Sequence, residues 1–576
     1  MNFNSWYTGQ ANISYQVTNL IKLKATFNYE NKRFKEYDHF WKYNPDGDLK
    51  KFQHGFNTTI TLDHTLSSTT FYTVKYAYFK KDFKQYVYED PTDPRYVNPN
   101  AAAFAVPAFT FGVGGQKNQH FNRNTQTHIG KFDITSQVSK NHLMKAGFEI
   151  RLHRLFYQDF NVIDIDQTDD ELFTPGIPSD TSTNFNQYTF KPVEYSFYVQ
   201  DKMEYEDFIV NIGLRFDYFD SKGRILRDPK DPNIRSPFLP EHQQMSLAER
   251  EQIWYDKPSP KLQLSPRVGV AYPITARGVI HFSYGHFLQI PEFRLLYQNP
   301  QFNVTRDRKK DNLVGNADLD AQRTVMYEIG LQQQLSDDIS IDVTGYYRDI
   351  RGWVGTSPLI ETYDNSTFYS QYENRDYANV RGVTLMFRKR FANHFSANLD
   401  YTFQVAEGNA SDPEDAFNDI KNDKEPRKTI IPLNWDRRHV LNGNVYLGFG
   451  GNGISVLARL ETGLPYTPQP ATGVRVGTNV PQGLRENSGR RPTLFTVDLQ
   501  LYRDIKFKVG NSEFKWTLFA KIYNLLDRRN EQNVYSDTGR ATYTITSGAF
   551  ADPEYIVRPD FYTQPRRVQL GFSWEF

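Results

Sequence analysis

The last ten residues, 567–576, most limit what this chain can fold into. Strand side chains alternate between two faces, and here one face carries only large apolar groups, namely Val568, Leu570, Phe572, Trp574 and Phe576. The other face carries Arg, Gln, Gly, Ser and Glu, so one side suits lipid and the other suits water. This pattern is typical of the closing strand of an outer-membrane β-barrel. An edge strand of a soluble sheet is the alternative, and recurrence of the pattern upstream decides between them.

The composition excludes a helical membrane protein but permits a barrel. No run approaches the roughly 18 apolar residues that a spanning helix needs, and 23% of the residues are charged. A barrel places only alternate residues in lipid, so a negative mean hydropathy does not argue against it. The 44 Phe, 37 Tyr and 7 Trp make 15% of the chain aromatic, which the aromatic girdles of a barrel would explain.

Charge and cysteine content remove several other classes of protein. Lys and Arg total 68 against 67 Asp and Glu, a balance that gives no reason to expect nucleic acid as a partner. The chain has no Cys, which excludes disulfides, thiolate metal sites and Cys nucleophiles. The first residues show no basic region followed by an apolar run, so we expect the signal peptide of an exported barrel to lie upstream of this sequence.

Short and long connections alternate strictly between the two-faced segments. The short ones are rich in turn residues and lie at 18–19, 67–69, 139–141, 206–207, 275–278, 336–338, 392–394, 450–453 and 510–511. The long ones lie at 35–50, 88–119, 161–190, 221–262, 293–320, 355–374, 408–433, 467–492 and 528–564. Tight periplasmic turns that alternate with long extracellular loops are the pattern of an outer-membrane barrel. A β-propeller or a large soluble sheet, the alternatives, would not produce it.

The segmentation predicts an all-β fold, a transmembrane antiparallel β-barrel with about nineteen strands. The polar faces of these strands, with Arg215 and Asp217 as examples, are expected to line a wet interior. By the order of the connections, the first and last strands both run toward the periplasm. We therefore expect an odd number of further strands upstream, three if the complete barrel has about 22.

Nine motifs appear in a fixed order over most of the chain. They are FYVQD (197–201), NIGLRFD (211–217), LSPRVGVAYP (264–273), SYGHFLQIP (283–291), VGNADL (314–319), YEIGL (327–331), WDRRH (435–439), GLPYTP (463–468) and IYNLLD (522–527). With these motifs the chain resembles the barrel of TonB-dependent receptors, which are outer-membrane active transporters. The resemblance is greatest to the Bacteroidetes-type members that carry a carboxypeptidase-regulatory-like module.

The resemblance implies partners that the motifs alone do not show. Residues 1–576 would be the barrel of a receptor in the outer membrane of a Gram-negative bacterium, and the N-terminal plug and the first strands would be absent from this sequence. Family members couple to the TonB complex through that plug, import a nutrient, and in some cases work with a surface lipoprotein. Phe572, Trp574 and Phe576 resemble the signal that the barrel-assembly machinery reads.

No motif predicts catalysis, a cofactor or a metal. His281 and His286 are five residues apart on one expected strand and so point to opposite faces. The segment 44–48 has the acidic character of a calcium loop but lacks the later bidentate Glu. No nucleophile elbow or phosphate-binding glycine loop is present, so we expect no enzyme.

We expect a ligand to bind where aromatic and amide side chains occur together in a long loop. The candidate residues are Tyr297, Gln298, Asn299, Phe302, Arg306 and Arg308, with Tyr363, Tyr369 and Tyr372 in the next loop. Flat rings stack on sugars or apolar groups, and the amides and Arg supply directional hydrogen bonds. The alternative is a loop whose Tyr rings pack only on one another.

Three functions are consistent with the interpretation of this chain as an outer-membrane barrel. The first is active import of a nutrient through a TonB-coupled barrel, with siderophore, cobalamin, glycan and peptide cargoes all open. The second is a passive porin. The third is a barrel whose loops bind another surface protein, such as a lipoprotein partner.

Overall fold

The computed structural model describes residues 3–99, 101, 106–166, 173–180, 182, 184–305, 312–422, 425–426, 429–469, 485–510, 512–545 and 551–575. The long strands are β1 (Asn4–Thr18), β2 (Ile21–Phe34), β3 (Lys50–Thr65), β4 (Thr70–Tyr86), β5 (Gln119–Ser139), β6 (His142–Asn161), β10 (Val193–Glu204), β11 (Ile209–Asp220), β14 (Lys261–Thr275), β15 (Gly278–Gln289), β17 (Gln322–Gln334), β18 (Ile339–Thr356), β20 (Phe368–Ala392), β21 (Phe395–Gly408), β23 (His439–Phe449), β24 (Asn452–Glu461), β27 (Leu494–Val509), β28 (Ser512–Tyr523) and β29 (Arg567–Glu575).

Shorter elements belong to the loops. The strands among them are β7 (Ile163–Asp164), β8 (Pro175–Gly176), β9 (Phe185–Phe190), β12 (Ile225–Leu226), β13 (Tyr255–Asp256), β16 (Leu313–Val314), β19 (Ile360–Glu361), β22 (Ile431–Pro432), β25 (Pro465–Tyr466) and β26 (Gly489–Arg490). The helices are α1 (Pro240–Gln243), α2 (Leu247–Ile253), α3 (Phe293–Tyr297), α4 (Asp415–Lys421) and α5 (Pro553–Ile556), with short 3-10 turns η1 (Pro45–Gly47) and η4 (Pro559–Phe561). None of the helices in the described ranges has the length and apolarity needed to cross a bilayer.

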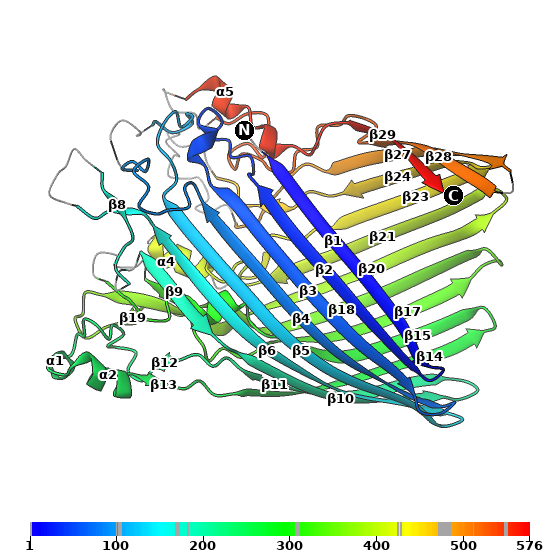
Figure 1. Cartoon of the computed structure of the whole chain (residues 1–576), viewed down its shortest axis with the longest axis horizontal. Helices are drawn as coiled ribbons and strands as arrows, with labels where there is room; N and C mark the ends of the chain where they lie inside the picture. The colour runs from blue at the N-terminus through cyan, green and yellow to red at the C-terminus, as the bar shows by residue number, and fades with distance from the viewer. Residues whose placement is uncertain are drawn as a thin grey trace.

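The long strands form one antiparallel meander in which each strand pairs with the next along the chain. Within the described residues, the main sheet holds 23 strands, four of them the short β9, β16, β19 and β22, which leaves nineteen long ones. All the tight turns lie at one end of the strands and all the long loops at the other (Figure 1). The predicted all-β antiparallel barrel is thus confirmed, together with the alternation of short and long connections.

Two of the tight turns have a backbone geometry that suits a two-residue hairpin. In the turn between β20 and β21, Asn393 and His394 both have positive φ, at 53° and 68°. In the turn between β23 and β24, Gly450 and Gly451 do the same, at 49° and 88°. Positive φ at both central positions is the type I′ arrangement, whose twist matches that of the flanking strands. These turns therefore hold neighbouring strands in register.

Apolar side chains form a continuous row around the outer face of the sheet. The strand registers place one residue of each of eight adjacent strands in this row: Leu23, Leu62, Val74, Phe132, Phe148, Phe197, Phe216 and Leu264. Phe197 is 50% exposed and Leu264 is 58% exposed. Large apolar groups in an unbroken exposed belt are unfavourable in water and match the hydrocarbon of a bilayer.

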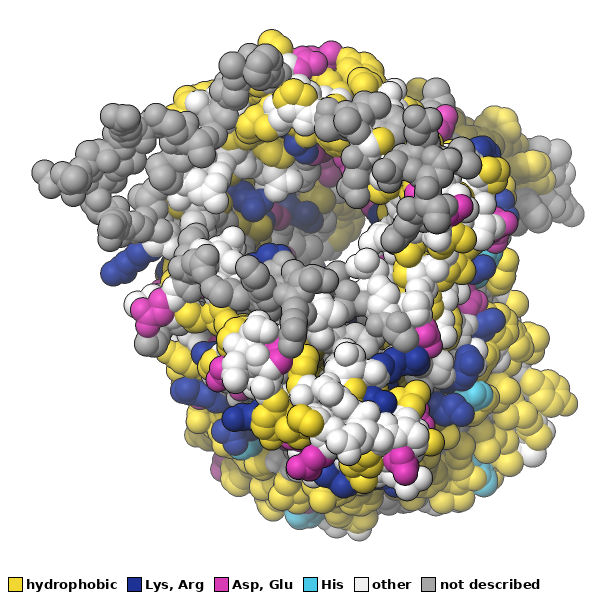
Figure 2. Space-filling view, turned by 90° about the vertical axis from the view of Figure 1, so that its left-hand side faces the viewer, with side chains coloured by type: hydrophobic (Ala, Val, Ile, Leu, Met, Phe, Trp, Pro, Cys, Tyr) yellow, Lys and Arg dark blue, Asp and Glu magenta, His cyan; other side chains and the backbone are white. Residues whose placement is uncertain are grey.

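Polar and charged side chains occupy the opposite, inner face. Lys24 Nζ lies 2.6 Å from Asp63 Oδ2 across β2 and β3, and the Tyr198 hydroxyl donates to Asp133 Oδ1 over 2.7 Å. Seen from the loop end, the molecule has a hollow interior with Lys, Arg, Asp and Glu on its wall (Figure 2). The inner face therefore surrounds a polar lumen instead of a packed core.

Aromatic side chains gather where the last strands approach the turns. Trp516 on β28 packs against Phe507 and Phe572, with ring centroids 4.8 and 5.7 Å apart. Phe572 and Trp574 on β29 are 54% and 58% exposed, as lipid-facing aromatics of an interfacial girdle would be. Phe576 lies outside the described residues, and the assembly role of Phe572, Trp574 and Phe576 stays a prediction.

The loop after β2 is joined to the last loop of the chain. His39 Nε2 donates to the Tyr555 carbonyl over 2.8 Å, so its Nδ1 accepts from the Tyr37 hydroxyl at 2.6 Å. Phe111 contacts the His39 and Tyr555 rings, with centroids 5.2 and 5.0 Å away. We call His39, Phe111 and Tyr555 the loop latch. β1 and β29 each pair on one side only within the described residues, so they are the two edges of the sheet. The latch joins the loop that follows β2 to the loop that precedes β29, and so it links the two edges.

We expect Phe197→Arg to lower the stability of the folded barrel by about 2–4 kcal/mol, because it puts a guanidinium in the apolar belt. Phe197→Leu is the apolar control. Gln332→Arg is the polar-face control, because Gln332 lies on the inner face of β17 opposite Asp342. Urea unfolding in lipid vesicles, followed by heat-dependent gel mobility, measures the difference. Equal losses for the two Arg variants would contradict an outer belt facing lipid.

The loop latch should weaken as the pH falls below about 6.5. Burial lowers the pKa of His39, with the positive charges of Arg558 and Lys42 adding to the effect of burial and the Tyr555 carbonyl and Asp560 opposing it. A lowered pKa means that the folded form prefers neutral His39. The contribution of His39 to the stability of the folded loops is therefore complete above the ordinary His pKa and is lost as the pH falls below it. Hydrogen exchange of residues 35–49 and 551–562 should rise between pH 7.5 and 5.5. In His39→Gln this rise should disappear, and a rise of the same size would show that another group controls the loops.

Candidate ligand-binding site at the loop end of the barrel

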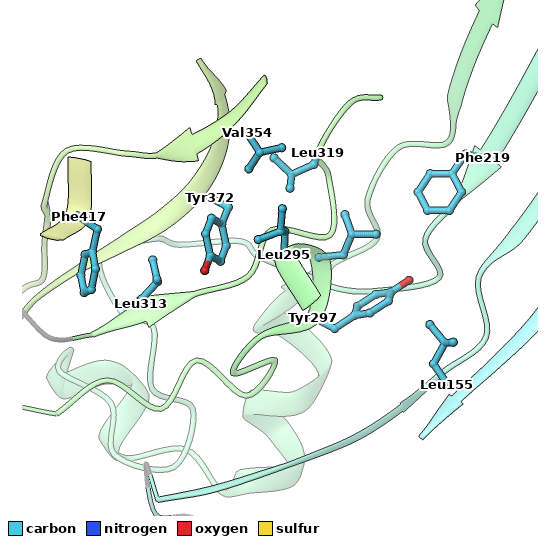
Figure 3. Packing of buried hydrophobic residues seen from close by; sticks show 10 residues of the cluster. Leu155, Phe219, Leu295, Tyr297, Leu313, Leu319, Val354, Tyr372 and Phe417 are labelled. Carbon is cyan, nitrogen blue, oxygen red and sulfur yellow. The ribbon is translucent and has the colours of Figure 1, made fainter. Parts of the chain in front are cut away.

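The loop between β15 and β17 turns inward at α3 and packs against the upper ends of several strands. Leu295, Leu296 and Tyr297 are the buried residues of this helix. They share one apolar cluster with Leu155 of β6, Phe219 of β11, Val354 of β18, Tyr372 of β20 and Phe417 of α4. Figure 3 shows α3 in the middle of this cluster, with Tyr297 extending toward Leu155 and Leu295 lying near Tyr372. The helix is therefore fixed at the mouth of the barrel by contacts with distant parts of the chain.

Tyr297 is the most enclosed side chain of α3. It is 1% exposed, its ring stacks on Phe190 with centroids 4.3 Å apart, and its hydroxyl donates to the Ser221 carbonyl. Burial raises the pKa of Tyr297, because the phenolate would lose its solvation. Tyr297 therefore anchors α3, and its ring is covered by protein.

An ion pair and hydrogen bonds link Arg294 of α3 with Tyr372 of β20 and with Glu414 of the loop that carries α4. Arg294 Nη1 lies 2.7 Å from Glu414 Oε1, and the Tyr372 hydroxyl donates to the same oxygen over 2.8 Å. Arg294 also donates to Gln298 Oε1 over 3.2 Å. Burial opposes ionisation of Glu414, but the Arg294 guanidinium and the Tyr372 hydroxyl hold its pKa below the ordinary value. This network keeps Gln298 at the edge of the inward-folded loop.

The other predicted ligand-binding residues lie in different surroundings. Phe302 is 2% exposed and packs with Val304, Val314 and Tyr369. Asn299 is held by its side chain, which donates to and accepts from the Asn303 backbone over 3.1 and 3.0 Å. Tyr363 is 42% exposed on an outer loop. Arg306 and Arg308 lie outside the described residues.

Tyr369 and Tyr372 are on a strand, so the prediction that they belong to a loop is wrong. β20 begins at Phe368 and pairs with β18 as far as Tyr372↔Thr356. Additional short ladders to β16 and β19 extend the sheet above the barrel wall at this point. The Tyr369 hydroxyl donates to the Pro229 carbonyl over 2.6 Å, which ties this part of β20 to the loop after β11.

A polar cavity of about 360 Å³ lies beside α3. Its lining comes from the starts or ends of β5, β6 and β9, from α3, and from the segments after α3: Gln119, Tyr157, Asp159, Phe160, Asn161, Asn184, Phe185, Asn186, Tyr188, Arg294, Gln298, Asn299, Asn303, Asn312 and Leu313. Of the predicted residues, Gln298 and Asn299 line the cavity. Tyr297 and Tyr372 are buried in the α3 cluster, and Phe302 and Tyr369 are buried in a second apolar cluster. Whether any of them binds a ligand stays a prediction.

Sequence reasoning missed the opposite wall of this cavity. Tyr157 and Asp159 are on β6, and Asn186 and Tyr188 are on β9, all more than a hundred residues before α3. One signal was available, because Asn184, Asn186 and Gln187 form an amide-rich stretch next to Phe185 and Tyr188. Only the fold shows that this stretch faces α3.

Across the described ranges, no group of three His, Asp or Glu side chains is arranged to hold a metal ion. The polar side chains of the site are amides, phenols, one carboxylate and a guanidinium that already has an acidic partner, and Phe160, Phe185 and Leu313 add apolar surface. Such groups bind by hydrogen bonding and by contact with flat rings.

The outer apolar belt, the polar lumen and the loop-end cavity define the class of the protein, a transmembrane β-barrel with a polar cavity at one mouth. The sequence profile of the family described as TonB dependent receptor-like, beta-barrel, matches residues 2–525. The chain therefore belongs to this family, whose members are outer-membrane receptors and transporters of Gram-negative bacteria. No match was found among curated proteins.

Solved structures share the fold at low sequence identity. The outer membrane transporter YddB from Escherichia coli is 13% identical with a TM-score of 0.62, and the match covers 99% of this chain and 68% of that one. The unliganded ferric citrate transporter FecA is 9% identical with a TM-score of 0.61, covering 100% and 70%. The FrpB iron transporter from Neisseria meningitidis (F3-3 variant) is 13% identical with a TM-score of 0.61, covering 99% and 71%.

Tyr297→Phe should reduce the free energy of unfolding by about 1 kcal/mol, because it removes one hydrogen bond and keeps the packing. Tyr297→Ala should cost about 3–5 kcal/mol, because it also leaves a cavity among buried rings. Urea unfolding gives both values, and hydrogen exchange localises the change to residues 290–299. Tyr363→Phe, on an exposed ring, is the control and should change neither. Equal effects of the Tyr297→Phe and Tyr363→Phe variants would contradict the anchoring role of Tyr297.

Proposed function

We propose that this chain is the barrel of an outer-membrane active transporter that binds a nutrient at its extracellular loops and imports it with TonB-coupled energy. The observation that carries the proposal is the inward-folded α3 loop, which builds a polar cavity at the mouth of a polar lumen. A ligand held there would lie at the entrance of a path across the membrane. Membership of the receptor family supports the same conclusion.

The structure of the loop end favours import over simple surface adhesion. The Arg294, Glu414 and Tyr372 network fixes α3 to the barrel wall, so the binding residues are held next to the lumen instead of projecting away from it. Cavities of roughly 300–1,000 Å³ are typical of small-molecule sites. The 360 Å³ cavity is of that size.

Several finer predictions belong to this proposal. The motifs favour a Bacteroidetes-type receptor of the carboxypeptidase-regulatory-like subgroup. In the complete protein, a plug domain would contact TonB, the barrel-assembly machinery would read the last strand, and a surface lipoprotein could serve as a partner.

Uptake by intact cells tests the proposal. Cells that make the protein should accumulate one class from a labelled panel of short saccharides, ferric complexes and short peptides, and should do so only when TonB is functional. Cells that lack the gene provide the background. Accumulation that continues without TonB would support the passive porin instead, and no accumulation of any class would favour a barrel that only binds a surface partner.

A further inference from the structure

We propose that the outer wall formed by β2 to β6 is a docking surface for a phosphate-bearing lipid of the surrounding membrane. The acyl chains of this lipid would lie on the apolar belt, and its phosphate groups would lie on a basic ledge above the belt. We define the basic ledge as Arg33, Lys80, Lys84 and Arg154. The inference concerns the membrane around the barrel, so it goes beyond the import function proposed above and does not depend on it.

The four residues of the basic ledge lie on the outer face of the wall. Each is an even number of residues from the belt residue of its own strand, which is Leu23 on β2, Val74 on β4 and Phe148 on β6. Side chains an even number of positions apart share a face of a strand. The pairings from β2 to β6 show no register shift between the belt and the ledge, and these strands lie side by side in one wall (Figure 1). The ledge therefore faces the same surroundings as the belt.

The basic ledge lies at the height where the hydrocarbon of the bilayer ends. Counted from Ile21, Thr70 and His142, the turn ends of β2, β4 and β6, its residues lie 10 to 14 positions along their strands. At about 3.3 Å per residue and a tilt of about 40°, this is roughly 25–35 Å above the turns, whereas the apolar band of such a barrel is about 25 Å tall. Tyr29 and Tyr76, nearer the turns on the same face, are 49% and 44% exposed, as interfacial aromatics would be.

Positive charge on the basic ledge is only partly neutralised by the protein. Lys80 Nζ lies 3.3 Å from Asp82 Oδ2, and the Asn124 amide donates to the other oxygen of this carboxylate. The other three residues of the ledge are exposed, and no carboxylate of the described ranges forms an ion pair with them. Strands lie about 4.8 Å apart, so the ledge extends about 19 Å from β2 to β6. It can therefore contact more than one phosphate group.

A phosphate-bearing lipid is the occupant that suits both parts of this surface. Phe56, which lies beside Lys80 in the register, is 40% exposed, and Leu152, two residues below Arg154, is 41% exposed. Acyl chains would cover these apolar groups, and phosphate oxygens would accept charge-assisted hydrogen bonds from the Lys and Arg side chains above them. A soluble anion or an acidic protein would meet only the ledge, because the belt below it is already occupied by hydrocarbon.

Elsewhere on the outer wall, cations at the same height have acidic partners. Arg351 Nε lies 3.0 Å from Asp349 Oδ1 on β18, and Arg381 Nη2 on β20 lies 3.0 Å from Glu407 Oε2 on β21. Arg381 is 11 positions from Ala392, the turn end of β20, and two positions from Val383, which is 42% exposed. Removal of Arg381 thus changes the net charge at the same height and on the same face, but outside the basic ledge.

Native mass spectrometry of the purified full chain in detergent micelles tests this inference. The probes are diphosphoryl lipid A, phosphatidylethanolamine, inorganic pyrophosphate and polyglutamate. Diphosphoryl lipid A should bind most tightly. Arg33→Gln, Lys84→Gln and Arg154→Gln should each weaken its binding about fivefold, the effect expected of one cation near an anionic lipid surface. Lys84→Arg, which keeps the charge, should retain the affinity.

Arg381→Gln is the matched control and should leave binding unchanged. Equal weakening by Arg381→Gln and the ledge variants would overturn the inference, because net charge alone would then explain binding. Phosphatidylethanolamine bound as tightly as diphosphoryl lipid A would overturn it in favour of the apolar belt alone. Equally tight pyrophosphate or polyglutamate would replace the lipid with a free phosphate or an acidic macromolecule. Heat-dependent gel mobility identifies folded variants, and the three ledge variants are on three different strands, so loss of folding in one leaves two tests.

Discussion

The structure depends on pairing the backbone N–H and C=O groups of neighbouring strands while side chains alternate between lipid and water. Hydrocarbon offers no hydrogen-bond partner, so a strand can cross it only inside a sheet whose ladders run without interruption. The register places Phe148, Phe197 and Phe216 side by side on the outside, and the same register places Arg215 and Asp217 inside. A shift of one residue would exchange these faces, which is why apolar patterning and register determine each other.

The packed apolar clusters of this protein lie among its loops. The barrel wall encloses a polar space, so buried side chains such as Tyr96, Tyr297 and Leu433 occur where loops fold onto strand ends. The α3 cluster draws on β6, β11, β18, β20 and α4, which are far apart in the chain. The loop end is therefore a folded layer with its own core, supported by the barrel in the way that a rigid scaffold supports functional loops.

This arrangement separates the residues that anchor the loop from those that line the cavity. The rings of Tyr297, Tyr372 and Phe302 are enclosed by protein and hold the loop in place, whereas the amides of Asn186, Gln298 and Asn303 line the cavity. Aromatic residues supply a large buried area for each side chain, and amides supply directional hydrogen bonds. A loop rich in both types can thus be rigid and polar at its surface, which reduces the ordering cost when a ligand binds.

The sequence by itself determined the class of fold and the spacing of the strands, because alternation and turn residues are local properties. The nine tight turns, the nine long loops and the outward faces of strands such as β11 all follow from residues next to one another in the chain. Within the loops, the sequence pointed to the segment around Tyr297 but could not distinguish residues that anchor the loop from residues that line the cavity. Which of Tyr297 and Gln298 faces the cavity depends on the segments of other loops that pack against them. Only the tertiary structure brought Asn186 and Tyr188 opposite α3 and continued β20 up to Tyr369, because those contacts join segments that the chain separates by many residues.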